Sequence, residues 1–357
     1  MDVNLRKDRM TKNERWVALL NRRPLDRVPV CGFTGGFSLV HTGLSIADFY
    51  NEPRKSYESQ MRVAEKFGFQ EIPRIAYAGF GGWEFGGEIK WPSGDFAQAP
   101  MILKYRVQKA DDISGLSMPD IKTAGIIPNI MQICRLVDES GSPYIWGLIC
   151  GPFTIAGNIC GMNTLARWLI RNPEAALRLM TLATEFMIDL AQYYADSFGA
   201  PRVILDIGDP STSNQVISPK QFENFVLPYA TKLADRVLGT GIKHIFLHAC
   251  GEQNANLPLW STVPLGNPGI VSVGHEVDLD IASKYFPGHV IMGNIEPALI
   301  QTGTPDRIYE AARVCIIKGR KHLGGFILSP GCELPPLAPE PNVWAIMQAV
   351  SDYGWYE

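Results

Sequence analysis

Short apolar, β-branched runs alternate with amphipathic stretches from residue 28 to the end of the chain. Alternation of this kind is typical of repeated β/α units built around a parallel sheet. Eight of these runs are predicted as strands, at residues 28–33, 71–77, 143–150, 202–207, 243–247, 269–273, 289–292 and 325–328. Eight strands, each followed by a helical stretch, predict an α/β protein with a single (β/α)8 TIM barrel.

The polar and apolar pattern also predicts what surrounds the barrel. Residues 173–198 and 219–238 have the pattern of long outer helices, and Ser218 and Pro219 supply an N-cap and a first helical residue for the second of them. A helical lead over residues 1–27 precedes the first strand. The stretch GFGGWEFGGEIKWPSGDF breaks the β/α rhythm and predicts a short hairpin. We therefore expect one domain over residues 1–357, with an insertion at about 78–119, after the second strand and over the barrel mouth.

Length and charge narrow the class of protein. A chain of 357 residues lies within the range of about 200 to 400 residues that one barrel occupies. The net charge of -3, with Lys and Arg scattered along the chain, argues against a nucleic-acid partner. The charged N-terminus lacks the apolar core of a secretory signal, and no apolar run reaches the roughly 18 residues of a membrane span. We expect a cytoplasmic protein without membrane association. Seven cysteines without regular spacing fit reduced thiols, so any one of them can be a metal ligand or a nucleophile.

Three potential metal ligands follow predicted strands, where the active sites of β/α barrels lie. His248 and Cys250 are two residues apart, so their side chains share one side if the strand continues through them, and Cys332 follows the last strand. One His with two Cys suits zinc, and three protein ligands leave a fourth position open for substrate. The spacing alone does not choose between this zinc site and buried residues at strand ends.

Further polar residues follow other strands of the predicted barrel. The carboxyl groups of Asp206, Asp209 and Glu296 are candidate catalytic proton donors; as alternatives, they anchor the metal site or cap strand ends. His275 and Glu333 are candidate contacts to substrate or metal.

Aromatic residues gather on the predicted mouth side. Phe33, Tyr77 and Trp83 are candidate substrate contacts, because aromatic side chains commonly line the pockets of small molecules. The alternative is that these rings only pack a lid.

Four stretches carry a resemblance to a known family: DIGDPSTSNQVISPKQFENFVLPY, HACGE, GNIEP and SPGCELPP. Together they resemble the uroporphyrinogen decarboxylase superfamily, in the branch of corrinoid-dependent methyltransferases. The resemblance runs over most of the chain and is strongest from about residue 200. It implies that His248, Cys250 and Cys332 bind Zn²⁺, and that a separate corrinoid (cobalamin) protein is the partner.

The resemblance to the decarboxylases themselves is weaker at the site. They place arginines after the first strand to hold the carboxylates of a porphyrinogen and an acid after the second, whereas this chain has CGFTGGFSLV and AYAGFGGW there. Decarboxylation is therefore disfavoured.

Within the methyltransferase branch two directions of transfer stay open. We first expect O-demethylation, in which methyl passes from a methoxylated aromatic to a Co(I) corrinoid, because an aromatic pocket suits a methoxylated ring better than a short sulfonate thiol. The alternative is transfer from a methylcobamide to a thiol of the coenzyme M type. A homo-oligomer is compatible with either.

Overall fold

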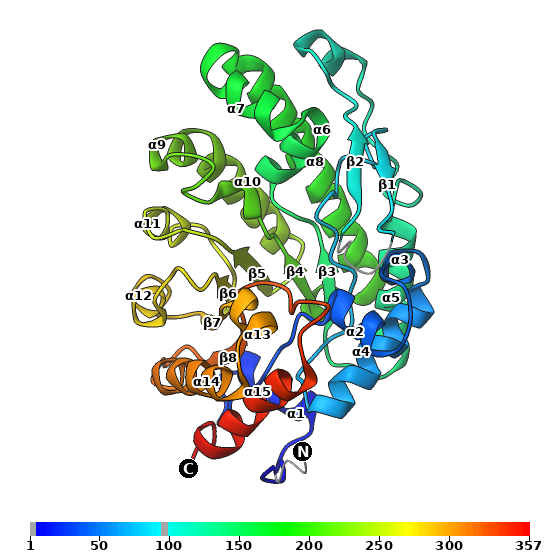
Figure 1. Ribbon diagram of the computed structural model, residues 1–357. Helices are drawn as coiled ribbons and strands as arrows, with labels where there is room; N and C mark the ends of the chain where they lie inside the picture. The colour runs from blue at the N-terminus through cyan, green and yellow to red at the C-terminus, as the bar shows by residue number, and fades with distance from the viewer. Residues whose placement is uncertain (1–4, 94–98) are drawn as a thin grey trace.

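The computed structural model describes residues 5–93 and 99–357. Its main sheet is parallel and has the strand order β3-β4-β5-β6-β7-β8. The strands are β3 Ile145–Leu148, β4 Val203–Asp206, β5 His244–Ala249, β6 Ile270–Val273, β7 Val290–Ile295 and β8 Phe326–Pro330. Helices follow these strands along the chain and lie outside the sheet (Figure 1). The predicted α/β class with a parallel sheet is confirmed.

The first two predicted strands are wrong as regular strands. Residues 28–33 meet β8 through a single bridge between Val30 and Leu328, and residues 71–77 follow one backbone hydrogen bond of 2.6 Å from Gln70 N–H to Val30. Proline lacks an N–H for a ladder, and each segment contains one, Pro29 and Pro73. The backbone N–H of Arg74 is also unavailable for strand pairing, because it donates to the side-chain Oε1 of Gln60 at 3.0 Å. Residues 28–33 therefore meet β8 without a regular ladder, residues 71–77 form no strand, and closure of the six-stranded sheet into a ring is not detected among the described residues.

Eight α-helices precede β4 in the described part of the chain. They are α1 Lys12–Leu20, α2 Gly35–His41, α3 Ile46–Asn51, α4 Pro53–Phe67, α5 Ile127–Glu139, α6 Pro152–Cys160, α7 Met162–Arg171 and α8 Pro173–Phe198. The last has the bounds predicted from its pattern. Trp16 of α1 packs edge-on against Trp146 of β3, with ring centroids 5.9 Å apart, so α1 seals one end of the sheet.

Helices of the second half follow the later strands. They are α9 Pro219–Gln221, α10 Leu227–Gly239, α11 Leu257–Trp260, α12 Leu279–Tyr285, α13 Pro297–Thr302, α14 Pro305–Gly319 and α15 Glu340–Tyr353. Ser218 caps α9 as predicted, by accepting a hydrogen bond from Gln221 N–H. A π-helical turn at Phe222–Val226 joins α9 to α10, so the predicted helix over 219–238 is continuous but not α-helical throughout.

The irregular stretch after the second segment contains the predicted hairpin. Strands β1 Glu88–Lys90 and β2 Met101–Lys104 pair antiparallel, and a short 3₁₀ helix follows at Ala110–Gly115. Residues 94–98, within the predicted insertion, and residues 1–4, within the predicted helical lead, lie outside the described residues. The division of the chain into lead, barrel and insertion stays a prediction.

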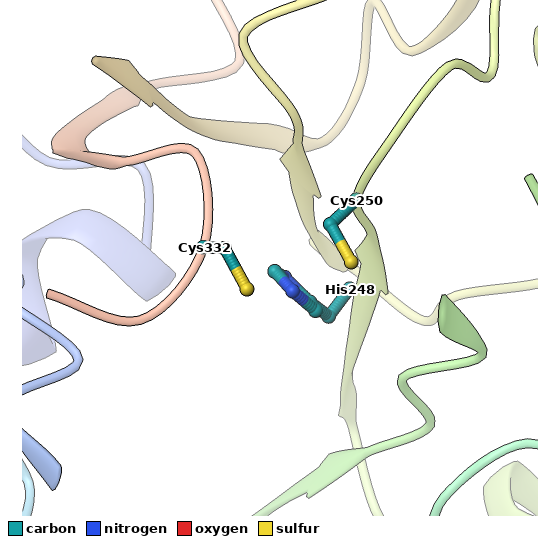
Figure 2. A group of neighbouring side chains, drawn as sticks. All are labelled: His248, Cys250 and Cys332. Carbon is teal, nitrogen blue, oxygen red and sulfur yellow. The ribbon is translucent and has the colours of Figure 1, made fainter. Parts of the chain in front are cut away.

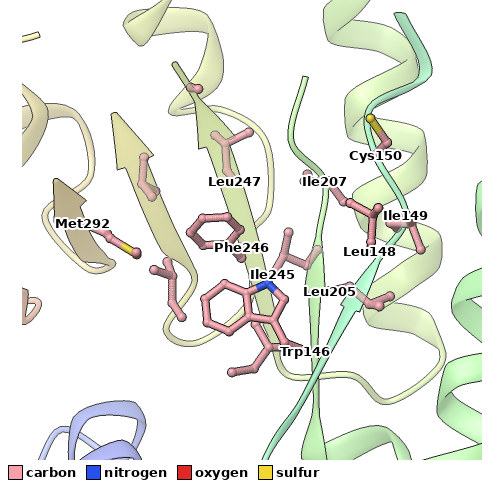
Figure 3. Close-up of a cluster of buried hydrophobic side chains, with 14 of the residues drawn as sticks. Trp146, Leu148, Ile149, Cys150, Leu205, Ile207, Ile245, Phe246, Leu247 and Met292 are labelled. Atoms are coloured by element: carbon pink, nitrogen blue, oxygen red, sulfur yellow. The ribbon is translucent and has the colours of Figure 1, made fainter. Parts of the chain in front are cut away.

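The core lies between the strands and the helices around them. Trp146 of β3 and Phe246 of β5 pack against each other at a ring-centroid distance of 4.7 Å, and Leu205 and Met292 belong to the same buried cluster (Figure 3). All four side chains are buried. Among residues 5–93 and 99–357, none of the helices combines the length and apolar character needed to cross a membrane.

Candidate metal centre and its cavity

Three side chains meet at the carboxyl ends of β5 and β8. His248 lies in β5, Cys250 directly follows that strand, and Cys332 lies in the loop after β8. Their potential ligand atoms all lie within 4.8 Å of one another. Figure 2 shows the two sulfur atoms and the imidazole converging from these two segments. The spacing of His248 and Cys250 thus has the effect predicted from the sequence, since both face the same point.

The ring of His248 is held by the neighbouring strand. Its Nδ1 lies 3.0 Å from the Oγ of Ser272, which is its partner residue in the β5–β6 register. The interaction at Nδ1 leaves Nε2 for the two cysteines. A histidine ligand oriented through its other nitrogen is the usual arrangement in metal sites.

The pKa values of the two cysteine thiols shift in opposite directions. Hydrogen bonds from Cys250 and His248 lower the pKa of Cys332, although burial acts in the opposite direction. The pKa of Cys250 is raised, because its thiol donates to Cys332 and because it is buried. Burial lowers the pKa of His248, but its hydrogen bond to Cys332 outweighs this effect, so the net shift is upward. The lowered pKa of Cys332 favours it as the thiolate of the pair, and the thiolate is the form of cysteine that binds metals. One nitrogen and two sulfur donors fit zinc and leave a fourth position open.

The candidate metal centre opens into a cavity of about 260 Å³. Its apolar lining comes from loops and helices early in the chain and from β3, and includes Phe33, Phe49, Tyr50, Tyr77 and Leu148. The hydroxyl of Tyr77 is buried without a hydrogen-bond partner in the described part of the chain. Phe33 and Tyr77, which were predicted as substrate contacts, both line this cavity. A largely apolar pocket with a few polar groups is typical of a small-molecule site.

Two lining residues adopt a backbone conformation that side chains rarely take. Phe33 has φ of 47° and Cys150 has φ of 61°. Left-handed backbone of this kind costs of order 1 kcal/mol or more for residues other than glycine and is concentrated at functional sites. Cys150 is held there by its own thiol, which donates to Gly208 O at 3.2 Å.

A buried ion pair on the cavity wall was not predicted from the sequence. Arg74 Nη1 lies 3.4 Å from Glu71 Oε1, and the guanidinium stacks between the rings of Phe33 and Trp146, at 4.5 Å and 4.3 Å. The other oxygen of Glu71 accepts from Gly32 N–H at 3.0 Å. Arg74 lies within an otherwise apolar predicted strand, and arginine is almost never fully buried unless it is paired. Its position in the sequence could therefore have indicated a buried ion pair.

Of the three predicted catalytic acids, one reaches the cavity. Asp206 ends β4, lines the cavity, and has its pKa raised by burial. Asp209 instead accepts from the N–H and hydroxyl of Thr154 at the start of α6, with burial raising its pKa to about 7. The side chain of Glu296 is exposed and lines a separate groove.

The remaining predicted contacts divide in the same way. Glu333 lines the cavity, accepts from Gly36 N–H at 2.8 Å, and has its pKa raised to about 7 by burial. His275 lies 3.4 Å from Glu276 and lines the separate groove beside Glu296. Trp83 packs edge-on against Trp91 at 5.5 Å and is not among the described lining residues.

The fold and the site together define an α/β protein with a His–Cys–Cys cluster at the carboxyl ends of its parallel strands. Residues 11–353 match the uroporphyrinogen decarboxylase (URO-D) family. The chain belongs to this family, and the resemblance predicted from its motifs is confirmed.

Individual relatives place the chain nearer to one group of the family. The methylcobamide:CoM methyltransferase MtbA of Methanosarcina acetivorans is 26% identical over 351 residues, covering 96% of this chain and 98% of the relative. A methylated-thiol–coenzyme M methyltransferase of Methanosarcina mazei is 28% identical over 254 residues, covering 66% and 62%. A uroporphyrinogen decarboxylase of Xylella fastidiosa is 25% identical over 327 residues, covering 84% and 85%.

A solved structure has the same fold. The chain superimposes on a methyltransferase from Methanosarcina mazei with a TM-score of 0.80 and 23% identity, over 96% of this chain and 99% of that one. At this identity the likeness speaks for the fold alone.

Proposed function

We propose that this protein is a zinc methyltransferase that moves a methyl group from the methylcobamide of a separate corrinoid protein to a thiol. One observation carries the proposal: His248, Cys250 and Cys332 meet within 4.8 Å at the wall of a cavity. The relatives named as methyltransferases support the class of reaction and favour a thiol acceptor over the O-demethylation that we first expected.

The three residues of the cluster would hold the metal ion, with His248 oriented by Ser272 and with Cys332 favoured as a thiolate by its lowered pKa. Bound zinc lowers the pKa of a substrate thiol and keeps it as a nucleophilic thiolate. In the proposed transfer the thiol sulfur would bond to the methyl carbon of the partner's methylcobamide, and the electron pair of the broken Co–C bond would stay with the corrinoid. Asp206 and Glu333 are the carboxyl groups of the cavity that can accept the proton of the thiol.

The aromatic wall of the cavity keeps O-demethylation as a second candidate. Phe33, Phe49 and Tyr77 would pack against a methoxylated ring, and the same metal position would then meet the methoxy oxygen.

One pair of assays separates the two directions. The zinc-loaded protein is mixed with methylcobalamin and a panel of thiols, or with Co(I)alamin and a panel of methoxybenzoates, and the corrinoid is followed by its absorbance. We expect methyl transfer in the first assay. Turnover in the second assay alone would reject the thiol acceptor and support demethylation.

A further inference from the structure

We propose that the cavity has a second recognition point, apart from the metal cluster, at which donors of Arg74, Thr34 and Tyr77 bind an acceptor oxygen of the substrate. The inference rests on the proposed function and deepens it, because it names the class of thiol that the site accepts. That class is a thiol whose other end carries an acceptor oxygen, as in a carboxylate, a sulfonate or an ether.

Three polar side chains of the cavity wall have a buried donor that no acceptor of the protein reaches. In the described part of the chain these donors are Thr34 Oγ1, Arg74 Nη2 and Tyr77 Oη. All three residues line the cavity, and at most 5% of each residue is exposed. A buried donor without an acceptor is unfavourable, so native structures keep few of them. Three in one cavity indicate an acceptor that comes from outside the chain.

The carboxyl groups of the same wall already have hydrogen-bond donors. Each of the three acidic lining residues accepts a hydrogen bond from a backbone N–H. The pairs are Glu71 with Gly32 at 3.0 Å, Asp206 with Gly208 at 2.8 Å, and Glu333 with Gly36 at 2.8 Å. No carboxylate oxygen of the described lining is buried without a partner. The hydrogen-bonding capacity that the wall leaves unused therefore lies in its donors.

Arg74 decides what the ligand must offer, because a guanidinium can only donate. Its Nη1 lies 3.4 Å from Oε1 of Glu71, and its guanidinium packs against the rings of Phe33 at 4.5 Å and Trp146 at 4.3 Å. These contacts hold the planar group in place and leave Nη2 without a partner among the described residues. A donor that is fixed before the ligand arrives binds it at little cost in side-chain ordering. An acceptor oxygen fits this position, whereas an ammonium group does not.

The size of the cavity restricts the rest of the molecule. Its volume of about 260 Å³ is small beside the roughly 300 to 1,000 Å³ of most ligand pockets. The metal cluster and the three donors belong to the same lining, which is otherwise largely apolar. A compact thiol is therefore the expected ligand, with its sulfur at the metal position and its oxygen at these donors.

The first test compares thiols of similar shape that differ at the far end. The pairs are 2-mercaptoethanesulfonate with 3,3-dimethylbutane-1-thiol, 3-mercaptopropionate with 3-methylbutane-1-thiol, and 2-methoxyethanethiol with butane-1-thiol. Titration calorimetry measures binding to the zinc-loaded protein. We expect the oxygen-bearing thiol to bind about tenfold more tightly in the two charged pairs and about threefold more tightly in the ether pair. Equal or tighter binding of the apolar thiols, or tighter binding of the donor 2-aminoethanethiol, would overturn the inference.

Three variants test the donors themselves. Arg74→Lys keeps the positive charge beside Glu71 but lacks the second nitrogen of the fork. Thr34→Val and Tyr77→Phe each remove one hydroxyl with little change in shape. We expect the preference for oxygen-bearing thiols to fall by about tenfold in Arg74→Lys and by about threefold in each hydroxyl variant, with zinc content unchanged. An unchanged preference in all three variants would reject the recognition point.

Stability separates a binding role of the two hydroxyls from a structural one. A buried hydroxyl that bonds to no protein group does not stabilise the fold, so Thr34→Val and Tyr77→Phe should keep or raise the urea midpoint. Thr184→Val is the matched control, because its buried hydroxyl donates to Met180 O at 2.7 Å. This control should lower the midpoint and leave the thiol preference unchanged. Lower midpoints in both hydroxyl variants, with the preference intact, would assign these hydroxyls to the fold and contradict the inference.

The outcomes also separate this inference from the proposed function. If thiols are methylated but an acceptor oxygen gives no advantage, the reaction stands and the recognition point falls. If oxygen-bearing thiols bind preferentially but no thiol is methylated, the reaction falls and the recognition point stands. If only methoxyaromatics react, 4-methoxybenzoate and 4-methylanisole replace the thiol pairs, and tighter binding of the benzoate would support the same donors.

Discussion

The Oγ of Ser272 lies 3.0 Å from Nδ1 of His248, directly across the β5–β6 pairing. Removing this hydroxyl with Ser272→Ala frees the ring to rotate away from Cys332. We expect zinc affinity to fall by about 10–100-fold, the usual effect of losing such a partner. Competition with a chromophoric chelator measures the change. Ser329→Ala, at a buried serine of β8 that bonds only to Pro330 in the described chain, serves as the control, and an equal loss in both variants would contradict the specific role of Ser272.

Cys332→Ala is expected to abolish zinc binding and methyl transfer together, because only two ligands remain. Elemental analysis of the purified protein gives the metal content. Cys315→Ala is the control, because it removes a buried thiol of α14 that donates to Oδ1 of Asn294 in β7. This variant should retain one zinc ion per chain. Stoichiometric zinc in the Cys332 variant would reject the proposed ligand set.

Zinc binding is expected to release at least one proton near neutral pH. Cys332 is the thiolate of the pair, since its pKa is lowered, but Cys250 holds its proton because its pKa is raised. Metal binding must remove that proton, so affinity rises with pH and falls as the solution is acidified. Calorimetry in buffers with different ionisation enthalpies counts the protons. Release of none would show that Cys250 does not bind as a thiolate.

The buried ion pair between Arg15 and Asp26 is predicted to stabilise the end of the sheet that α1 covers. Arg15 Nε lies 2.8 Å from Asp26 Oδ1, and Nη2 lies 2.9 Å from Oδ2. Asp26→Asn leaves the fully buried guanidinium with only the half-exposed Asp8 as counter-charge, which should cost about 3 kcal/mol of unfolding free energy. Urea unfolding measures this loss, and Glu185→Gln, which breaks an exposed ion pair with Lys232, should cost under about 1 kcal/mol.

The same pair predicts a pH dependence of stability. Burial opposes ionisation of Asp26, but hydrogen bonds from Arg15 outweigh it and hold its pKa below the ordinary value. A lowered folded-state pKa means that the unfolded chain binds protons first. The contribution is therefore complete above about pH 4 and is lost as the pH falls further. The stability difference between the wild type and Asp26→Asn should shrink in that acid range; a constant difference would contradict this assignment.

The sequence predicts the later half of the fold well and the earlier half less well. Six strands are regular because runs such as 203–206 and 290–295 are continuous and buried, which is the pattern of parallel sheet. Pro29 and Pro73 are a signal against regular strands in the first two runs, because proline has no N–H to donate to a neighbouring strand. The β-branched residues of these two runs nevertheless fit the hydrophobic pattern of strands, so the pattern alone predicts two regular strands.

The order of the strands predicts which candidate residues come together. His248, Cys250 and Cys332 converge because they lie at or just after the carboxyl ends of two regular strands, β5 and β8. Glu296 and His275 also follow strands, but their side chains face a separate groove, and strand order alone does not give that direction. Arg74 was missed because its role depends on stacking between rings distant in sequence, a tertiary contact that no local pattern encodes.

The two walls of the cavity come from different parts of the chain. The ligand cluster belongs to β5 and β8, whereas Phe33, Phe49 and Tyr77 belong to segments before residue 78. Mutations can therefore accumulate in the early segments while the metal chemistry is conserved. Under the proposed function, this architecture would separate the reaction from its specificity, so that a lineage could acquire new methyl acceptors by altering one wall of the cavity alone.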